Sequence, residues 1–412
     1  MIKVKYSIRL SFLEGIFSAA QGGLTDNFLT PYALALRATV PQIGLLSSIP
    51  QLLGALSQLA CGTLSDWLRS RKKLIAVSAF AHACIWLPIL SIPWILPQYG
   101  IQILIVLVTL AFAFAGFAGP AWMSLLSQYA PPSRRGRFFG TRQSLVGFTS
   151  VLVGFLAGGI LHLFRSRVFV GFSILFAGAF IFRSISAFLL SRLYEPKSTN
   201  HLIRSSGLFH ILRGPQFRPF WRVALFMGAM QAGVNLSAPY IAVYLLRDVG
   251  YTYPQYTLAM LVAATSGFCL MRPWGKLADR VGNARILRIC SFCITFIPFL
   301  WLVSPRLEYL VWIQFFAGGV WGGFTLCGSN YVLDAVAPEH RTRCIAVFNI
   351  INSAGVFLGA FVGGSLAAHL PKIFGYQILT VFLISAFARI AAWLLLSGGV
   401  REVRPLRPLA PG

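Results

Sequence analysis

The sequence has few charged residues, and acidic residues are the scarcest among them. Asp and Glu number 10 in 412 residues, and all charged residues together make up 11% of the chain. A soluble domain carries about 25% charged residues. Such a domain could not bury the 57% of residues that are hydrophobic here. The composition therefore excludes a water-soluble globular fold.

Basic residues outnumber acidic ones and give a net charge of +25. Basic chains often bind nucleic acids, so this class needs separate consideration. The lysines and arginines do not form a stripe on one face, because they cluster in short gaps between long apolar runs. That distribution is typical of a polytopic membrane protein, and we expect no nucleic-acid partner.

Motifs for metal binding, redox chemistry and ATP hydrolysis are also missing. The seven cysteines are scattered, and we interpret the CSFC stretch at 290–293 as small packing residues. His82, His162 and His369 show no metal-ligand spacing, and the chain has no G-x-x-x-x-G-K-(S/T) loop. We expect no cofactor, no metal and no catalytic residues.

Long apolar runs dominate what is present. A run of about 20 residues is needed to cross about 30 Å of hydrocarbon. Twelve such runs are centred near residues 23, 53, 85, 115, 150, 180, 232, 264, 293, 322, 357 and 386. The predicted fold class is an all-α polytopic membrane protein with twelve transmembrane helices.

The basic residues predict the orientation of these helices. If the amino terminus is cytoplasmic, most of the 35 lysines and arginines fall in cytoplasmic segments. The basic residues on the other side are Arg37, Arg165, Arg167, Arg247, Arg306 and Lys372. Because basic loops stay in the cytoplasm, we expect both termini there, in a multi-pass protein of a bacterial inner (plasma) membrane.

Short motifs recur in the same order in the two halves of the chain. The pairs are GTLSDWLRSRKK (62–73) with GKLADRVGNARI (275–286), TPYALALR (30–37) with APYIAVYLLR (238–247), PQIGLL (41–46) with PQYTLAML (254–261), APPSRRGR (130–137) with APEHRTR (337–343), and VGFLAGGIL (153–161) with LGAFVGGSL (358–366). Ordered matches of this kind indicate two pseudo-symmetric six-helix bundles. We predict bundles over 1–192 and 218–400, a cytoplasmic linker over 193–217 and a cytoplasmic tail over 401–412.

The first of these pairs, here called the charged motifs, follows the second and eighth predicted helices. With the six-plus-six pattern, their G-x-L-x-D-(R/K)-x-G-type spacing resembles the major facilitator superfamily of secondary transporters over the whole chain. The second motif has Gly282 at the last glycine, where the first has Arg69. Trp67 also replaces the usual basic residue of the first motif.

The resemblance implies an inner gate that holds the inner faces of the two halves together when the cavity opens outward. Its members are Gly62, Asp66, Arg71, Gly275, Asp279, Arg280, Asp334 and Arg341. A glycine near a helix end permits close helix packing, and an aspartate there can accept bonds from a helix amino end or an arginine. The alternative for basic residues such as Arg71 is that they only determine topology.

Polar side chains concentrate in a few of the predicted helices. Such groups are costly inside a membrane and usually face a cavity, and helices 1, 4, 7 and 10 line the path in the resembled family. The predicted substrate cavity contains Gln21, Asn27, Trp122, Gln231, Asn235, Tyr240, Gln314, Trp321 and Asn330. A hydrogen bond between helices is the alternative for each Asn and Gln.

Two carboxylates of the first helix are candidates for proton coupling. Asp26 is favoured, because we expect it close to the bilayer centre with no basic residue within a helical turn. Glu14 is the second candidate. A structural ion pair with Arg183, which lies at a similar inner depth, is an alternative role for Glu14.

The predicted function is a monomeric secondary transporter in the lipid bilayer that moves a small organic solute by alternating access. We favour a proton as the coupling ion, with sodium second. A hydrophobic-drug efflux antiporter is the alternative, although the fifth helix lacks the Gly-Pro pair of typical drug antiporters. A lipid-modifying membrane enzyme would need a convergent His, Asp or Ser cluster, and a non-transporting scaffold would normally add a soluble domain. Neither feature is evident, so we expect no enzyme.

Overall fold

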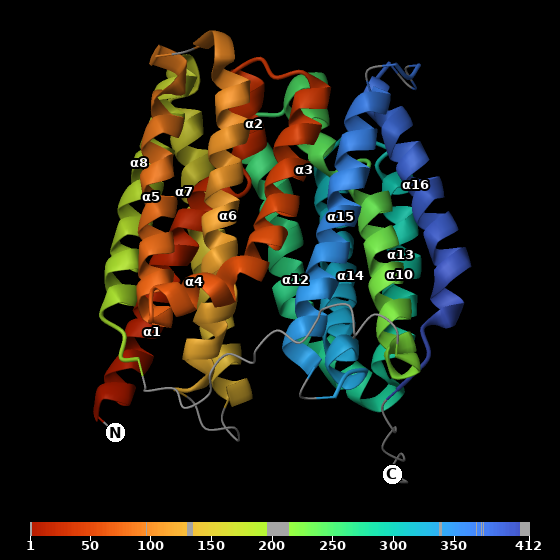
Figure 1. Ribbon diagram of the computed structural model, residues 1–412. Coiled ribbons are helices and arrows are strands. Elements are labelled where there is room, and N and C mark those ends of the chain that lie inside the picture. The colour runs from red at the N-terminus through yellow and green to blue at the C-terminus, as the bar shows by residue number, and fades with distance from the viewer. Residues whose placement is uncertain are drawn as a thin grey trace. The chain divides into compact units, whose positions relative to one another are not determined.

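The computed structural model describes residues 2–95, 97–129, 135–195, 214–337, 340–367, 369–371, 373 and 375–403. Regular structure in these residues is helical, apart from one isolated bridge between Ile373 and Tyr376 (Figure 1). The chain divides into two compact units. Unit 1 comprises Met1–Arg204 with Tyr251–Thr257, and unit 2 comprises Ser205–Gly250 with Leu258–Gly412.

Unit 1 holds the first six predicted membrane segments. Its helices are α1 (Ile2–Thr25), α2 (Leu29–Ala35), α3 (Val40–Ser57), α4 (Cys61–Trp67), α5 (Arg71–Ile95), α6 (Gly100–Ser127), α7 (Arg135–Leu163) and α8 (Val168–Ser191). The pair α1 and α2 forms one interrupted segment, and α3 and α4 form another, joined by a 3-10 turn at Gln58–Ala60.

Unit 2 repeats this plan, again with an interrupted first segment. Its helices are α10 (Arg218–Asn235), α11 (Ile241–Val243), α12 (Tyr253–Val281), α13 (Asn283–Leu300), α14 (Leu307–Asp334), α15 (Arg341–Ala367) and α16 (Gln377–Leu396), with a π-helical turn at Tyr244–Asp248.

Nine helical stretches of the described residues are long and apolar enough to cross a membrane. The segments beginning with α1, α10 and α12 are the other three of the twelve. Each of them carries charged residues, such as Glu14 in α1, Arg222 in α10 and Arg272 in α12, which lower its mean hydropathy. The predicted all-α fold of twelve membrane helices is confirmed.

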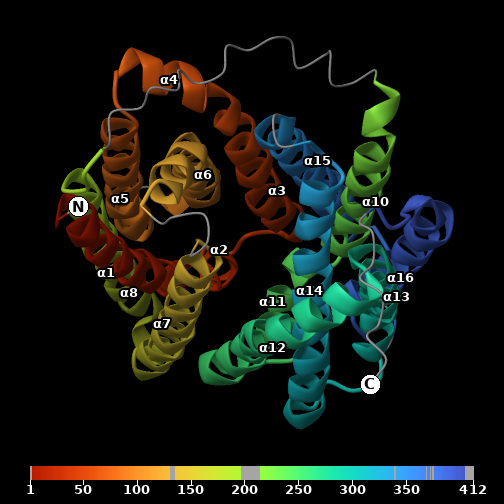
Figure 2. The same cartoon turned by 90° about the horizontal axis from the view of Figure 1, so that it is seen from below.

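Helices at equivalent places in the two halves have equivalent neighbours. In unit 1 the packing order is α7, α1, α8, α5, α6 and α3, as Figure 2 shows end-on. In unit 2 it is α15, α10, α16, α13 and α14. Helix α12 packs next to α14 and completes this order. The two helices are close, because a β-carbon on Gly322 of α14 would lie 2.7 Å from the Gly267 carbonyl of α12. The repeat found in the sequence therefore extends to the packing.

The exact bundle boundaries at 192 and 218 stay predictions. Helix α8 ends at Ser191, and a short 3-10 turn begins at Pro215. Of the predicted linker and tail, residues 196–213 and 404–412 lie outside the described residues.

Both units tie the segment after their last helix to the end of their fourth helix through a tyrosine. Tyr129, just after α6, donates its hydroxyl to the carbonyl oxygen of Tyr194 over 2.7 Å. Tyr331, in α14, donates to the carbonyl oxygen of Arg401 over 2.7 Å. Both tyrosines are buried, so each hydroxyl needs this partner.

The residue after each of these carbonyls, Glu195 after Tyr194 and Glu402 after Arg401, is a glutamate that binds the start of the third membrane helix of its half. Glu195 accepts hydrogen bonds from the backbone N–H groups of Arg71 (2.9 Å) and Lys72 (3.4 Å) at the start of α5. Glu402 accepts one from the backbone N–H of Ala284 (2.9 Å) at the start of α13. A carboxylate at a helix amino end satisfies N–H groups without intrahelical partners and is favoured by the helix dipole.

The turns within the two charged motifs, just after α4 and α12 end, share an unusual backbone conformation. Arg69 has a φ of 51°, and Gly282, at the matching place in the second motif, has a φ of 93°. Positive φ suits glycine and costs other residues about 1–2 kcal/mol. The glycine of the family pattern therefore serves the turn, and Arg69 adopts the same kind of conformation at a cost.

We predict that Arg69→Gly is more stable than Arg69→Ala by about 0.5–1 kcal/mol. Both variants remove the side chain, so the comparison isolates the backbone preference. Thermal unfolding of the purified protein measures the difference. In an ordinary helix alanine is the more stabilising of the two, so an advantage for Arg69→Ala would contradict a strained turn.

We also predict that Glu195 makes the protein sensitive to acid. Burial raises the pKa of Glu195. Hydrogen bonds from Ser70, the Arg71 and Lys72 amides and the Arg71 side chain lower it by more, so the net pKa lies below the ordinary 4.5. Ionised Glu195 therefore stabilises the fold fully above pH 4.5, and this stability is lost as the pH falls through the lowered folded-state pKa.

The test is the melting temperature of wild type and Glu195→Gln between pH 3 and pH 7. We expect the variant to be less stable near neutral pH by about 1–2 kcal/mol, with the gap closing in acid. A gap that stays constant with pH would show that ionisation of Glu195 contributes nothing.

Candidate functional site

The first membrane segment is broken at residues 26–28. Helix α1 ends at Thr25 and α2 begins at Leu29. Pro31 explains the break, because it has no N–H to offer the carbonyl of Asn27 and its ring disfavours a continuous helix. Broken membrane helices are common at transport sites, where the freed backbone groups meet solutes or ions.

Asp26 lies at this break with an exposed side chain. Its Oδ1 accepts a hydrogen bond from the hydroxyl of Thr25 (3.2 Å), whose oxygen accepts another from Gln21 Nε2 (2.9 Å). No ion pair to Asp26 occurs among the described residues. Along the segment it lies past the midpoint, toward the Arg37 end. Its depth near the bilayer centre stays a prediction.

The matching segment of unit 2 is broken at the equivalent place. Helix α10 ends at Asn235, and Pro239 lies in the 3-10 turn Ala238–Tyr240 that follows. This proline again removes the N–H that would pair with the carbonyl four residues earlier, that of Asn235. The two breaks thus have the same sequence cause.

A buried arginine, Arg389 of α16, stabilises the second break. Its guanidinium donates to the carbonyl of Val234 (3.4 Å) and the hydroxyl of Ser237 (3.0 Å), and also to the carbonyl of Ile294 (3.1 Å). Gly233 makes room, because a β-carbon there would lie 3.1 Å from Arg389 Cγ. A cation at the carboxyl end of a helix is favoured by the helix dipole.

Glu14 lies in a separate, buried cluster of unit 1. Arg142 of α7 donates to its Oε2 over 2.7 Å, and Ser186 of α8 donates to its Oε1 over 3.1 Å. Gly15 leaves space for this pair, since a β-carbon there would lie 2.9 Å from Arg142 Nη2. The guanidinium also lies 4.6 Å from the ring centre of Trp122, a favourable cation–π distance.

The partner of Glu14 is therefore Arg142, and the expected pair with Arg183 is wrong. Arg183 donates to His82 Nδ1 (3.1 Å), Ser18 (3.0 Å) and Ser186 (3.3 Å). Ser186 links the two residues, because it accepts from Arg183 and donates to Glu14.

Two of the predicted cavity residues instead join helices. Tyr240 is fully buried and donates its hydroxyl to the Ala360 carbonyl of α15 (2.5 Å). Gln314 is buried and donates to the Ala259 carbonyl of α12 (3.2 Å). Each side chain thus bonds a neighbouring helix, as in the alternative considered for the polar residues, and a role in binding a solute stays a prediction for both.

The remaining candidates differ in how accessible they are. Gln21 is buried against Thr25, and Asn235 donates to the backbone carbonyl of Gln231 over 2.9 Å. The residues that stay partly accessible are Asn27, Trp122, Gln231, Asn235, Trp321 and Asn330. Their role in binding a solute stays a prediction.

The inner-gate residues of the first charged motif differ in their surroundings. Asp66 is exposed, and a β-carbon on Gly62 would meet no atom within 4 Å. The close packing expected at Gly62 is therefore wrong. Arg71 is buried and bonds Glu195 (3.4 Å) and Ser124 (3.0 Å). It is thus part of the packing of unit 1 and more than a topology signal.

In unit 2 the gate candidates gather around the ends of α12 and α14. Asp334 accepts a hydrogen bond from Asn283 Nδ2 over 2.9 Å, and Arg341 donates to the carbonyl of Leu333 over 3.2 Å. Asp279 and Arg280 are exposed in the last turn of α12. At Gly275 a β-carbon would make an ordinary 3.6 Å contact with Leu326. A gating role for these residues stays a prediction.

Sequence reasoning missed Arg142, Glu195 and Glu402. Arg142 follows a cluster of basic residues but lies about two turns inside α7. The glutamates carried a signal, because LYE at 193–195 and VRE at 400–402 end the last segment of each half.

We predict that Glu14 and Arg142 are energetically coupled. Removing one partner leaves the other charge buried, at a cost of about 3–5 kcal/mol. The double variant Glu14→Gln/Arg142→Gln should cost less than the sum of its parts, with a coupling of at least about 1 kcal/mol. Denaturant unfolding of the four proteins measures this.

The pair Arg247–Asp248 is a matched control, since its nitrogen and oxygen lie 2.8 Å apart, close to the 2.7 Å of Glu14 and Arg142, but the Arg247 side chain is 48% exposed. The same cycle there should give a coupling below about 1 kcal/mol. Additive costs at Glu14 and Arg142 would contradict a buried ion pair.

Comparison with known proteins places this architecture in a family. The Major Facilitator Superfamily profile matches residues 12–313 and 223–411. The multi-drug resistance efflux pump PmrA of Streptococcus pneumoniae is 24% identical over 387 residues, which cover 91% of this chain and 92% of PmrA. The uncharacterized MFS-type transporter MJ1560 of Methanocaldococcus jannaschii is 25% identical over 371 residues, 88% of this chain and 91% of its own.

Solved structures show the same fold. The nucleoside transporter NupG matches with a TM-score of 0.71 at 16% identity, over 95% of this chain and 99% of NupG. A bacterial homologue of the iron transporter ferroportin matches with a TM-score of 0.73 at 12% identity, over 96% of this chain and 99% of its own. With the family profile matched over nearly the whole length, the chain belongs to the Major Facilitator Superfamily of membrane transporters.

Proposed function

We propose that this protein is a secondary transporter that couples the movement of a small organic solute to a proton through Asp26. The observation that carries the proposal is an exposed carboxylate at a helix break inside a membrane segment. A charged group facing hydrocarbon costs several kcal/mol, so the exposed surface of Asp26 is expected to face water. A carboxylate in contact with water can exchange protons.

Glu14 suits coupling less well than Asp26. It is buried and paired with Arg142, so protonation would leave a buried arginine without its counter-charge. Asp26 has only the hydroxyl of Thr25 as a hydrogen-bond donor among the contacts of the described residues. A neutral donor of this kind is compatible with either protonation state.

The relatives bear on the class of function. They are transporters, which supports a non-enzymatic role over a lipid-modifying enzyme or a scaffold. A second candidate, efflux of hydrophobic drugs, is favoured by the similarity to PmrA and to a protein named multidrug resistance protein MdtG from Rahnella, which is 23% identical over 354 residues. In either case a sodium ion is the alternative coupling ion, and we propose a monomer that works by alternating access.

We predict that Asp26→Asn abolishes uphill transport but retains exchange. A solute is first selected by thermal shift, from a panel that contains both small metabolites and cationic dyes. Its accumulation is then followed in proteoliposomes with and without an imposed pH gradient. Wild type should concentrate the solute in response to the gradient, and the variant should only equilibrate it, because the carried proton has lost its site.

The matched control is Asp248→Asn, which also neutralises an aspartate but lies beside Arg247 at the end of its segment. It should still accumulate solute. Gradient-driven accumulation by Asp26→Asn would contradict the proposed role of Asp26 and would make Glu14 the next candidate.

We also propose that the protein resides in a bacterial plasma membrane with both termini in the cytoplasm. The basic residues on one side of the predicted segments support this orientation. Reporter fusions after residues 135 and 249 are predicted to report the cytoplasm and the outside, respectively. Equal signals from both fusions would contradict this orientation.

A further inference from the structure

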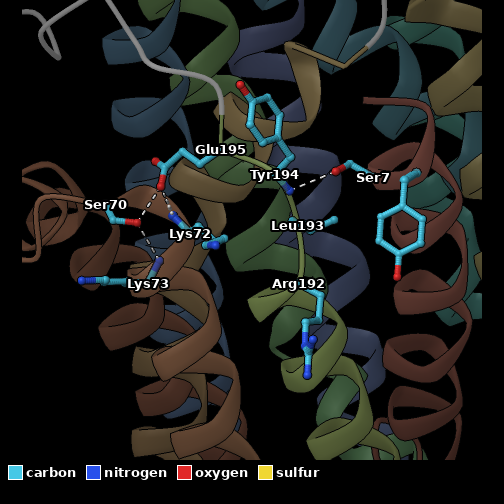
Figure 3. A pocket seen from close by; sticks show the side chains of 9 residues that line it. Ser7, Ser70, Lys72, Lys73, Arg192, Leu193, Tyr194 and Glu195 are labelled. Atoms are coloured by element: carbon cyan, nitrogen blue, oxygen red, sulfur yellow. Dashed lines mark hydrogen bonds between the residues drawn. The ribbon is translucent and has the colours of Figure 1, made fainter. Parts of the chain in front are cut away.

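A cavity of about 480 Å³ opens at the end of unit 1 where the chain begins. The starts of α1 and α5 and the segment after α8 enclose it, as Figure 3 shows. Three basic residues line it: Lys72, Lys73 and Arg192. The transport role proposed above makes no use of this cavity, because Asp26 and Glu14 are not among its lining residues.

Among the described residues that line the cavity, one is acidic, Glu195, and it is already engaged. Glu195 accepts bonds from the Ser70 hydroxyl (2.5 Å) and the backbone N–H groups of Arg71 and Lys72. The bond to Lys72 comes from its backbone, so the ammonium group is not involved. No ion pair joins Lys72, Lys73 or Arg192 to an acidic residue in the part of the chain that the structure describes.

The lining also contains neutral groups suited to an interfacial ligand. Tyr6 is 58% exposed at the start of α1, and Tyr194 lies opposite Ser7, which accepts a hydrogen bond from the Tyr194 backbone N–H (2.9 Å). Tyrosines are enriched where a membrane helix leaves the hydrocarbon, at the depth of lipid headgroups. The cavity lies at the ends of α1, α5 and α8, where we expect the headgroups.

We propose that this cavity binds a phosphate group, supplied by the headgroup of an anionic phospholipid. Ammonium and guanidinium groups form charge-assisted hydrogen bonds with phosphate oxygens, and the flexible stems of the two lysines can turn toward one anion. Basic pockets at the ends of membrane helices recognise phospholipid headgroups by this chemistry. Free inorganic phosphate shares it and is the other source of the same group.

The proposal is tested with two charge-matched double variants of the full-length protein. Lys72→Gln/Lys73→Gln removes two charges from the cavity and keeps the backbone donors to Glu195. Arg285→Gln/Arg288→Gln removes two exposed charges from the start of α13, the equivalent helix of unit 2. Native mass spectrometry counts the copies of phosphatidylglycerol and phosphatidylcholine that each purified protein retains.

We expect wild type and Arg285→Gln/Arg288→Gln to retain phosphatidylglycerol in preference to phosphatidylcholine. Lys72→Gln/Lys73→Gln should lose about tenfold or more of that preference, since each lysine near a lipid surface contributes severalfold. A second arm titrates inorganic phosphate into protein in phosphatidylcholine nanodiscs and follows it by phosphorus NMR. Phosphate binding that is lost only in the lysine variant, without lipid enrichment, would support a phosphate site filled from solution.

Two results would overturn the proposal. One is equal retention of both lipids by wild type together with no binding of inorganic phosphate. The other is an equal loss of preference in the two double variants, which would assign the effect to net surface charge and not to the cavity.

Discussion

Hydrocarbon offers no hydrogen bonds, so every polar group that a membrane helix buries must find its partner within the protein. This constraint explains the main contacts of both units. Arg142 donates to Glu14 over 2.7 Å, Arg389 donates to the carbonyl oxygens of Val234 and Ile294, and the tyrosines at the ends of α6 and α14 bond carbonyls of the segments after α8 and α16. The exposed carboxylate of Asp26 departs from this pattern, and for that reason it is our candidate for function.

The two halves show how one plan accommodates different chemistry. Prolines at 31 and 239 break the first segment of each half at the same place. In unit 2 the buried Arg389 donates to the Val234 carbonyl and the Ser237 hydroxyl at the break. In unit 1 the equivalent place holds an acidic residue that stays exposed. The two halves thus share the backbone break but differ in the charged residue found there.

The sequence was sufficient to predict the fold, because hydropathy and repeated motifs survive without tertiary information. The helix centres, the repeat and the family were predicted from these signals. Side-chain partners were not, since they depend on helix rotation and depth, which composition does not determine. Arg142 was therefore missed, Arg183 was considered as an alternative partner of Glu14, and Tyr240 and Gln314 were expected in a cavity, although each bonds a neighbouring helix.

The central claim is that Asp26 exchanges a proton when the solute binds. The most direct measurement is the pH change of a weakly buffered solution of purified protein on addition of a solute that stabilises it. Wild type is predicted to release or take up protons in proportion to the bound solute, and Asp26→Asn is predicted to bind the solute with no pH change. A proton exchange of the same size in Asp26→Asn would contradict the account.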